Sequence, residues 1–130
     1  MDVIEVSSQR RRQLVDVTTY VQEAVAASGV AAGLAHVAVP HTTASVLLNE
    51  NADPAVGDDI LRALEAMLPA IPWRHAEGNS DAHLLSTLVG HSVTVPIAEG
   101  ELALGRWQAV YLLELDGPRK REIWITCLGA

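Results

Sequence analysis

Short segments in which apolar and polar residues alternate recur along the chain, a pattern typical of β-strands with one buried face. Two strands are predicted over 2–8 and 13–18, and the charged stretch QRRRQ between them is expected to be a solvent-facing turn. Further strands are predicted over 33–40, 43–50, 91–97, 99–105, 106–115 and 121–128. The last two are almost continuously apolar and are joined by DGPRK, which is typical of a hairpin. We therefore expect both faces of their sheet to be covered.

Apolar residues at helical spacing predict three helices between these strands. The first helix is expected to begin with a capping box of Thr19 and Gln22 and to end at Gly29. The second is expected to begin at Asp53-Pro54 and to end at Pro69 and Pro72. A shorter third helix is expected to begin at Ser80 or Asp81 and to end at Gly90. Because strands and helices interleave without a regular βαβ repeat, the order of elements favours an α+β fold over a doubly wound sheet. A length of 130 residues suits one domain, 1–130.

Charge and cysteine content narrow the class of protein. The formal net charge is −7, so the chain lacks the basic face with which a nucleic-acid-binding module neutralises phosphates. A few converging arginines could still bind one phosphate locally. Cys127 is the only cysteine, which excludes an internal disulfide. We see no signal peptide and no apolar run of the ~18 residues that a membrane helix needs, so we expect a soluble, cytoplasmic protein without nucleic-acid or membrane partners.

Three histidines, His41, His75 and His83, lie beside polar residues and near the ends of predicted elements. Imidazoles from three separate segments can form an open metal site that leaves one position for water or substrate. The sequence contains no HExxH and no CxxC motif, so the spacing alone does not specify a metal. The alternative is three unrelated histidines, each hydrogen-bonded or exposed.

Polar residues also interrupt two of the apolar segments. If the strand that ends at Glu50 alternates regularly, this carboxylate shares a face with Val46 and Leu48 and needs a partner. Gln108 and Glu114 lie on one face of a later strand. Their position indicates a cleft or a subunit interface, unless the ends of the strand emerge into solvent.

A basic cluster, Arg119, Lys120 and Arg121, lies at the predicted hairpin. Solvated turn charges explain the cluster, although arginine is also the natural bidentate partner of a phosphate or carboxylate. Neither Ser45 nor Ser86 lies in a GxSxG motif, which argues against a Ser-His-Asp hydrolase. The segment GELALG lacks the Lys and Ser/Thr of a phosphate-binding loop.

Four segments, in this order, resemble the YjbQ-like family over nearly the whole chain: HTTASVLLNENADPAVGDD, RHAEGNSDAHL, LGHSVTVPI and GELALGRWQAVYLLELDGPRKR. The motifs H-T-T with N-E-N-x-D, A-H before L-x-x-x-L-x-G, L-G-x-W-Q and E-x-D-G-P-R are specific in combination. The resemblance implies a compact α+β fold with a β-sandwich-like core of mostly antiparallel strands and two or three helices. It also implies assembly as a homotrimer.

The resemblance further implies a secondary thiamine-phosphate synthase, which couples hydroxymethylpyrimidine diphosphate weakly with thiazole phosphate and releases pyrophosphate. The catalytic residues that it implies are His41, Glu50, His83 and Glu114. The substrate-binding or phosphate-binding residues are Thr42, Thr43, Asn49, Gln108 and Arg119, with Asp58 as a further polar position. The implied metal ligands are His41, His75 and His83, which would hold a divalent cation such as zinc or magnesium.

These residues are compatible with more than one function. An enzyme that releases pyrophosphate must stabilise the charge of the leaving group, and Arg119 or a metal could do so. A non-catalytic trimer could use the same residues to bind a metal or a phosphorylated metabolite. In a third hypothesis, the polar groups satisfy one another at trimer interfaces. No residue pattern in the sequence identifies the native substrate.

Overall fold

Eight strands and three helices make up the fold, and the computed structural model describes all residues from 1 to 130. In chain order the elements are β1 (Asp2–Ser7), β2 (Gln13–Asp16), α1 (Thr18–Ser28), β3 (Gly33–Ala38), β4 (Ala44–Glu50), α2 (Pro54–Ala66), α3 (Ser80–Val89), β5 (Ser92–Ala98), β6 (Glu101–Leu102), β7 (Gln108–Glu114) and β8 (Lys120–Gly129). The α+β prediction is confirmed. The strand predicted over 99–105 is reduced to the two residues of β6.

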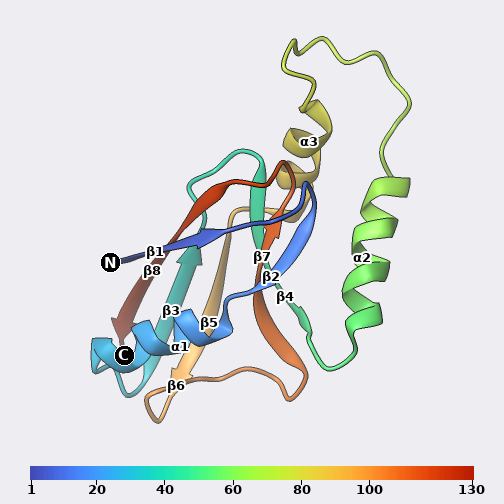
Figure 1. Ribbon diagram of the computed structural model, residues 1–130. Helices are drawn as coiled ribbons and strands as arrows, with labels where there is room; N and C mark the ends of the chain where they lie inside the picture. The colour runs from blue at the N-terminus through green and yellow to red at the C-terminus, as the bar shows by residue number, and fades with distance from the viewer.

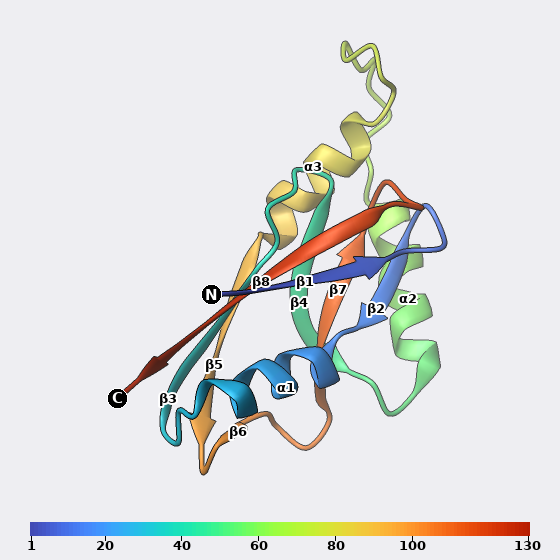
Figure 2. The same ribbon diagram turned by 60° about the vertical axis from the view of Figure 1, so that its left-hand side comes forward.

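The strands form two antiparallel sheets (Figures 1 and 2). One sheet has five strands in the order β1-β8-β3-β5-β6, and the other has three in the order β2-β7-β4. The first and last strands of the chain are therefore neighbours, with Ile4 opposite Ile123. In the smaller sheet Val46 lies opposite Leu112, so two buried residues meet on the inner face.

The main core lies between the two sheets and is closed by α1, which contacts strands of both. Its buried members come from α1, from both sheets and from the connections beside them: Val6, Val17, Val21, Ala24, Val37, Val39, Ala44, Val46, Val110, Leu112, Ile123 and Ile125. Because most of these side chains are β-branched, they suit the pleated surface of a sheet and fill the space that aromatic residues occupy in other cores.

A second core covers the other face of the three-stranded sheet. Leu113 and Leu115 pack there against Ala82 and Leu85 of α3. The leucines of α2 contribute only partly buried surface, and no residue of that helix is fully buried. Figure 1 shows α2 standing beside the sheet and a long connection leading from its end to α3. Both faces of β7 are thus covered, as its continuous apolar run predicted.

The five-stranded sheet differs, because β8 alternates between buried and accessible residues. Arg121, Ile123 and Ile125 point into the core, whereas Glu122 and Leu128 are exposed. Within one chain, the prediction that both faces would be covered therefore fails for β8. Its outward face mixes the apolar Trp124 and Leu128 with the polar Glu122 and Thr126. No helix of the structure is both long and apolar enough to cross a bilayer.

One of the three predicted helix N-termini has the capping interaction that its sequence predicts. Asp53 caps α2 as predicted, since its side chain accepts the Ala55 N–H. The predicted capping box of α1 is absent, because Gln22 bonds to the Gly100 carbonyl and the Leu102 N–H next to β6. In α3 the N-cap residue is Asn79 rather than either residue predicted, and its side chain makes no capping bond.

Candidate functional site

A hollow of about 300 Å³ opens where three connections of the chain meet, and no apolar residue lines it. Its lining residues are Thr42 and Thr43 before β4, His75, Glu77 and Asn79 before α3, His83 in the first turn of α3, and Arg119 in the β7–β8 hairpin. We call it the polar hollow. Five of these seven residues were predicted as site residues from the sequence; Glu77 and Asn79 lie within a family motif, but no role was predicted for them.

Two imidazoles form one side of the polar hollow. The rings of His75 and His83 pack edge to face, with their centroids 5.6 Å apart. The Nε2 atom of His75 lies 3.7 Å from Oε2 of Glu77, and both of these side chains are well exposed. Imidazole is the side chain that most readily exchanges a proton near neutral pH, so this pair can serve as a proton donor or acceptor to a ligand.

Arg119 is held in place by its own hairpin. Its Nε donates to the Asp116 carbonyl at 2.8 Å, and its Nη2 donates to Oδ2 of Asp116 at 2.9 Å. The same carboxylate oxygen accepts from Nδ2 of Asn79 at 2.9 Å. Half of the Arg119 side chain remains exposed, so the guanidinium can still offer donors to an anion in the polar hollow.

A buried ion pair lies next to the polar hollow and holds Thr43 in place. Glu114 is 0 % exposed and Arg121 is 4 % exposed. Nε of Arg121 donates to Oε1 of Glu114 at 2.8 Å, while its Nη2 donates to the Thr43 hydroxyl at 2.9 Å and to the Thr43 carbonyl at 3.0 Å. The pair therefore fixes one of the residues that line the polar hollow.

Further hydrogen bonds favour the ionised form of Glu114. The Ser8 hydroxyl donates to it at 2.6 Å, and the backbone N–H groups of Leu115 and Asp116 each donate at 3.0 Å. Burial alone raises the pKa of Glu114, but the bonds from Arg121, Ser8 and Asp116 together lower this pKa below its ordinary value.

Enclosure removes Glu114 from contact with any substrate, so the catalytic role predicted for it does not fit the structure. Its task is to hold the hairpin and Thr43. Arg121 was interpreted as a solvated turn charge, and that interpretation is wrong. The signal that could have revealed it was its spacing, since Arg121 lies two and four residues before the inward-facing Ile123 and Ile125.

His41 lies outside the polar hollow. Its Nε2 accepts the backbone N–H of Glu122 at 2.8 Å on the five-stranded sheet. Burial lowers the pKa of His41, and the nearby charge of Arg121 lowers it further. Within one chain no group of three or more His, Cys, Asp or Glu side chains is placed to hold a metal ion, so the predicted zinc or magnesium site does not form from His41, His75 and His83 of a single chain.

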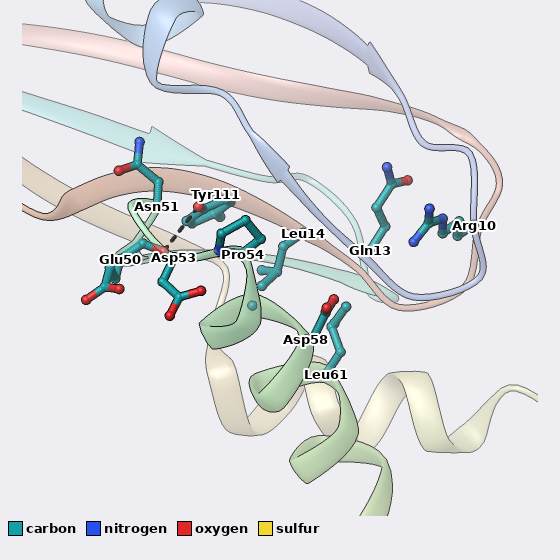
Figure 3. Close-up of a pocket in the computed structure, with 11 residues that line it drawn as sticks. Arg10, Gln13, Leu14, Glu50, Asn51, Asp53, Pro54, Asp58, Leu61 and Tyr111 are labelled. Carbon is teal, nitrogen blue, oxygen red and sulfur yellow. Dashed lines mark hydrogen bonds between the residues drawn. The ribbon is translucent and has the colours of Figure 1, made fainter.

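A second hollow, of about 250 Å³, lies between the start of α2 and the three-stranded sheet. Figure 3 shows Glu50 and Asn51 at one end of it and Arg10 with Gln13 at the other. Asp58 also lines this second hollow. The second hollow takes in Glu50, whereas His41 lines neither hollow, so one chain does not place these two residues in a common pocket.

The remaining predicted residues lie at the far end of the three-stranded sheet. Asn49 is exposed, and its side chain accepts the N–H of Glu50. Gln108 is exposed too, and its Oε1 accepts the Gly105 N–H across the turn that precedes β7. Neither side chain lines the polar hollow or the second hollow.

The spacing of these motifs and the fold that carries them match a known protein family. The sequence fits the family described as UPF0047 protein YjbQ-like over residues 2–130. The chain belongs to this family. Among relatives, UPF0047 protein MJ1081 of Methanocaldococcus jannaschii is 45% identical over 127 residues, which cover 96% of this chain and 91% of the relative. UPF0047 protein YugU of Bacillus subtilis is 38% identical, with 99% of each chain covered.

Solved structures confirm the fold of this YjbQ-like protein. A YjbQ/UPF0047 family protein from Clostridium acetobutylicum superposes with a TM-score of 0.95 at 41% identity, covering 98% of this chain and 100% of that one. The hypothetical protein APE1520 from Aeropyrum pernix superposes with a TM-score of 0.91 at 40% identity, covering 99% and 98%. The α+β arrangement of two antiparallel sheets and three helices is therefore that of the YjbQ structures.

Proposed function

We propose that the polar hollow binds the phosphate of a small phosphorylated metabolite and catalyses a reaction at that group. The observation that carries this proposal is the convergence of Arg119, two imidazoles and two threonine residues on a hollow without an apolar wall. Such a set can surround an anion with charged and neutral donors. Glu77 is the one acidic side chain in the lining, and it is largely exposed beside His75.

The reaction that we propose is a weak thiamine-phosphate synthase coupling. The ring nitrogen of the thiazole phosphate forms a bond to the methylene carbon of the pyrimidine diphosphate. The carbon–oxygen bond to the diphosphate breaks, and its electron pair leaves on pyrophosphate. Arg119 would stabilise the charge that accumulates on the leaving oxygen, and a protonated His83 or His75 would donate a hydrogen bond or a proton to it.

The residues that line the polar hollow support binding of a phosphate more than binding of the two heterocyclic rings. A hollow without apolar residues offers no surface on which a pyrimidine or a thiazole could stack. We therefore propose that the coupling is a side activity and that the native substrate is another phosphorylated metabolite. Arg119 is the arginine of the lining that would hold the phosphate, and a divalent cation bound with it would neutralise further charge.

Calorimetric titration of the protein with inorganic phosphate and with pyrophosphate tests the proposal. Arg119→Gln should weaken binding by about 10-fold to 100-fold, because a hydrogen bond to a charged group contributes ~1.5–3 kcal/mol. The matched control is Arg62→Gln on α2. Arg62 also pairs with an aspartate three residues away, but it lies outside the polar hollow.

Four results would decide between the functions. Unchanged affinity in both variants would refute an anion site at Arg119. Loss of affinity in Arg119→Gln alone, with EDTA having no effect, would support it. Turnover of the two thiamine precursors by the wild type that disappears in His83→Gln would support an enzyme. Binding without conversion of any phosphorylated metabolite would instead support a non-catalytic binding protein.

We also propose that the protein assembles as a homotrimer through the open face of the five-stranded sheet. Val3, Leu34 and Leu128 support this, because these large apolar side chains of β1, β3 and β8 are exposed on the sheet. Sedimentation should find a trimer that Leu128→Glu dissociates; a monomeric wild type would refute the assembly. A cytoplasmic location, where Cys127 would stay reduced, belongs to the same proposal.

A further inference from the structure

Asn79 lies at the floor of the polar hollow and is 7 % exposed. It is the N-cap residue of α3, and its backbone carbonyl accepts the N–H groups of Ala82 and His83. Asparagine at this position ordinarily caps the helix with its side chain, but here the side chain makes no capping bond. The amide is therefore free of the helix and turned to other partners.

The orientation of this amide is fixed by Asp116. Nδ2 of Asn79 donates to Oδ2 of Asp116 at 2.9 Å, and Arg119 donates to the same carboxylate oxygen. A carboxylate that is held by an arginine only accepts hydrogen bonds, so the reversed amide would set two acceptors against each other. Oδ1 of Asn79 must then be the atom that lies away from Asp116.

Oδ1 of Asn79 is buried and has no hydrogen-bond partner in the chain. A buried acceptor without a donor is costly, and native proteins seldom tolerate one unless a ligand or a solvent molecule completes it. The atom belongs to a residue that lines the proposed phosphate site. A fully ionised phosphate carries acceptors only and cannot satisfy Oδ1, so the donor has to come from another part of the ligand or from a solvent molecule.

We propose that Asn79 is a specificity-determining residue that recognises a hydroxyl or amino group on a phosphate monoester bound in the polar hollow. This inference rests on the proposed function, because the phosphate must occupy the hollow for the second group to reach Asn79. Arg119 and the histidines bind the charged end of the ligand, and Oδ1 accepts a hydrogen bond from the donor a few bonds away. The side chain of Glu77 is largely exposed, so it can move aside to admit this group.

Three short esters test the proposal: 2-hydroxyethyl phosphate, 2-aminoethyl phosphate and ethyl phosphate. They share the phosphate and differ at the other end, which is a neutral hydroxyl, a protonated amine or a methyl group without a donor; the hydroxyl and ethyl esters therefore form the pair that is matched in charge. Calorimetry at about pH 8 keeps the phosphate as a dianion, so the phosphate itself offers no donor. We expect at least one donor-bearing ester to bind wild-type protein about threefold to tenfold more tightly than ethyl phosphate. Which of the two is preferred distinguishes a hydroxyl from an amine.

In Asn79→Leu, which keeps the branching and the number of heavy atoms of the side chain, 2-hydroxyethyl phosphate and ethyl phosphate should bind with equal affinity. Asp116→Asn is a second variant, in which the amide of Asn79 is no longer held in one orientation, and the preference should also shrink there. Asp116→Asn also loses a hydrogen bond to Arg119, which would change the affinities for all three esters together. The informative quantity is therefore the ratio of the affinity for a donor-bearing ester to the affinity for ethyl phosphate. Equal binding of the three esters by the wild type would overturn the role of Asn79. Retention of the preference in Asn79→Leu would overturn it equally. Failure of all three esters to bind would overturn the phosphate site itself.

Discussion

Arg121 and Glu114 form an ion pair inside the protein, with Nε and Oε1 2.8 Å apart and both side chains almost completely enclosed. The pair joins the β7–β8 hairpin to Ser8 and to Thr43, which are distant in the sequence. Two of its neighbours, Thr43 and Arg119, line the polar hollow. The ion pair therefore positions residues of the polar hollow and does not itself contact a ligand.

Removal of one partner of this pair should be strongly destabilising. In Arg121→Met the Glu114 carboxylate would stay buried without its counter-ion, and we expect a loss of about 3–5 kcal/mol in the free energy of unfolding. The double variant Glu114→Gln with Arg121→Met leaves no buried charge and should recover part of that loss. Urea unfolding of the three proteins measures both effects. A loss in Arg121→Met below about 1 kcal/mol would show that the pair is not buried in solution.

The same carboxylate should make the protein sensitive to acid. Because the pKa of Glu114 is lower in the folded protein than in the unfolded chain, its stabilisation is complete above the unfolded value of about 4.3 and is lost as the pH falls through the folded value. Glu114→Gln lacks this titration. The difference in unfolding free energy between wild type and variant should therefore shrink from about pH 7 to about pH 3. A constant difference over that range would contradict the lowered pKa.

His41 should contribute a second, separate pH dependence. Burial and then the charge of Arg121 lower its pKa, so the folded state favours the neutral imidazole. This stabilisation is present above the unfolded value of about 6.5 and is lost as the pH falls from there through the folded value. His41→Gln can still accept the Glu122 N–H but does not titrate. Wild type should lose stability relative to this variant between about pH 7.5 and about pH 5, and NMR titration should place the imidazole pKa below its ordinary value.

The parts of the fold that the sequence predicted correctly depend on local interactions. The start of α2 follows from Asp53 and Pro54 alone, since the cap and the first turn involve residues two apart. The alternation of β4 and the hairpin before β8 are equally local. The residues of the polar hollow were recognised through family motifs, and the structure brings five of them together.

Two further misses, the buried Arg121 and the absent capping box at Gln22, come from contacts between distant segments. Gln22 leaves its expected capping box because Leu102, eighty residues further on, offers a backbone donor to its side chain. Arg121 is buried because β8 pairs with β1 and faces Glu114, a register that composition does not encode. The orphaned Oδ1 of Asn79 likewise follows from Asp116, which fixes the amide from another connection.

Two glycines should respond in opposite directions to replacement by alanine. A Cβ atom on Gly33 would overlap the carbonyl oxygen of Leu128 on the neighbouring strand, so Gly33→Ala should destabilise the protein by about 1–3 kcal/mol or more. In Gly57→Ala, inside α2, the new methyl group would meet only a side-chain atom of Leu14 at 3.4 Å. Because alanine is the better helix former, this variant should stabilise the protein by up to about 1 kcal/mol. Urea unfolding compares the two, and a stabilised Gly33→Ala would contradict the close approach of β3 and β8.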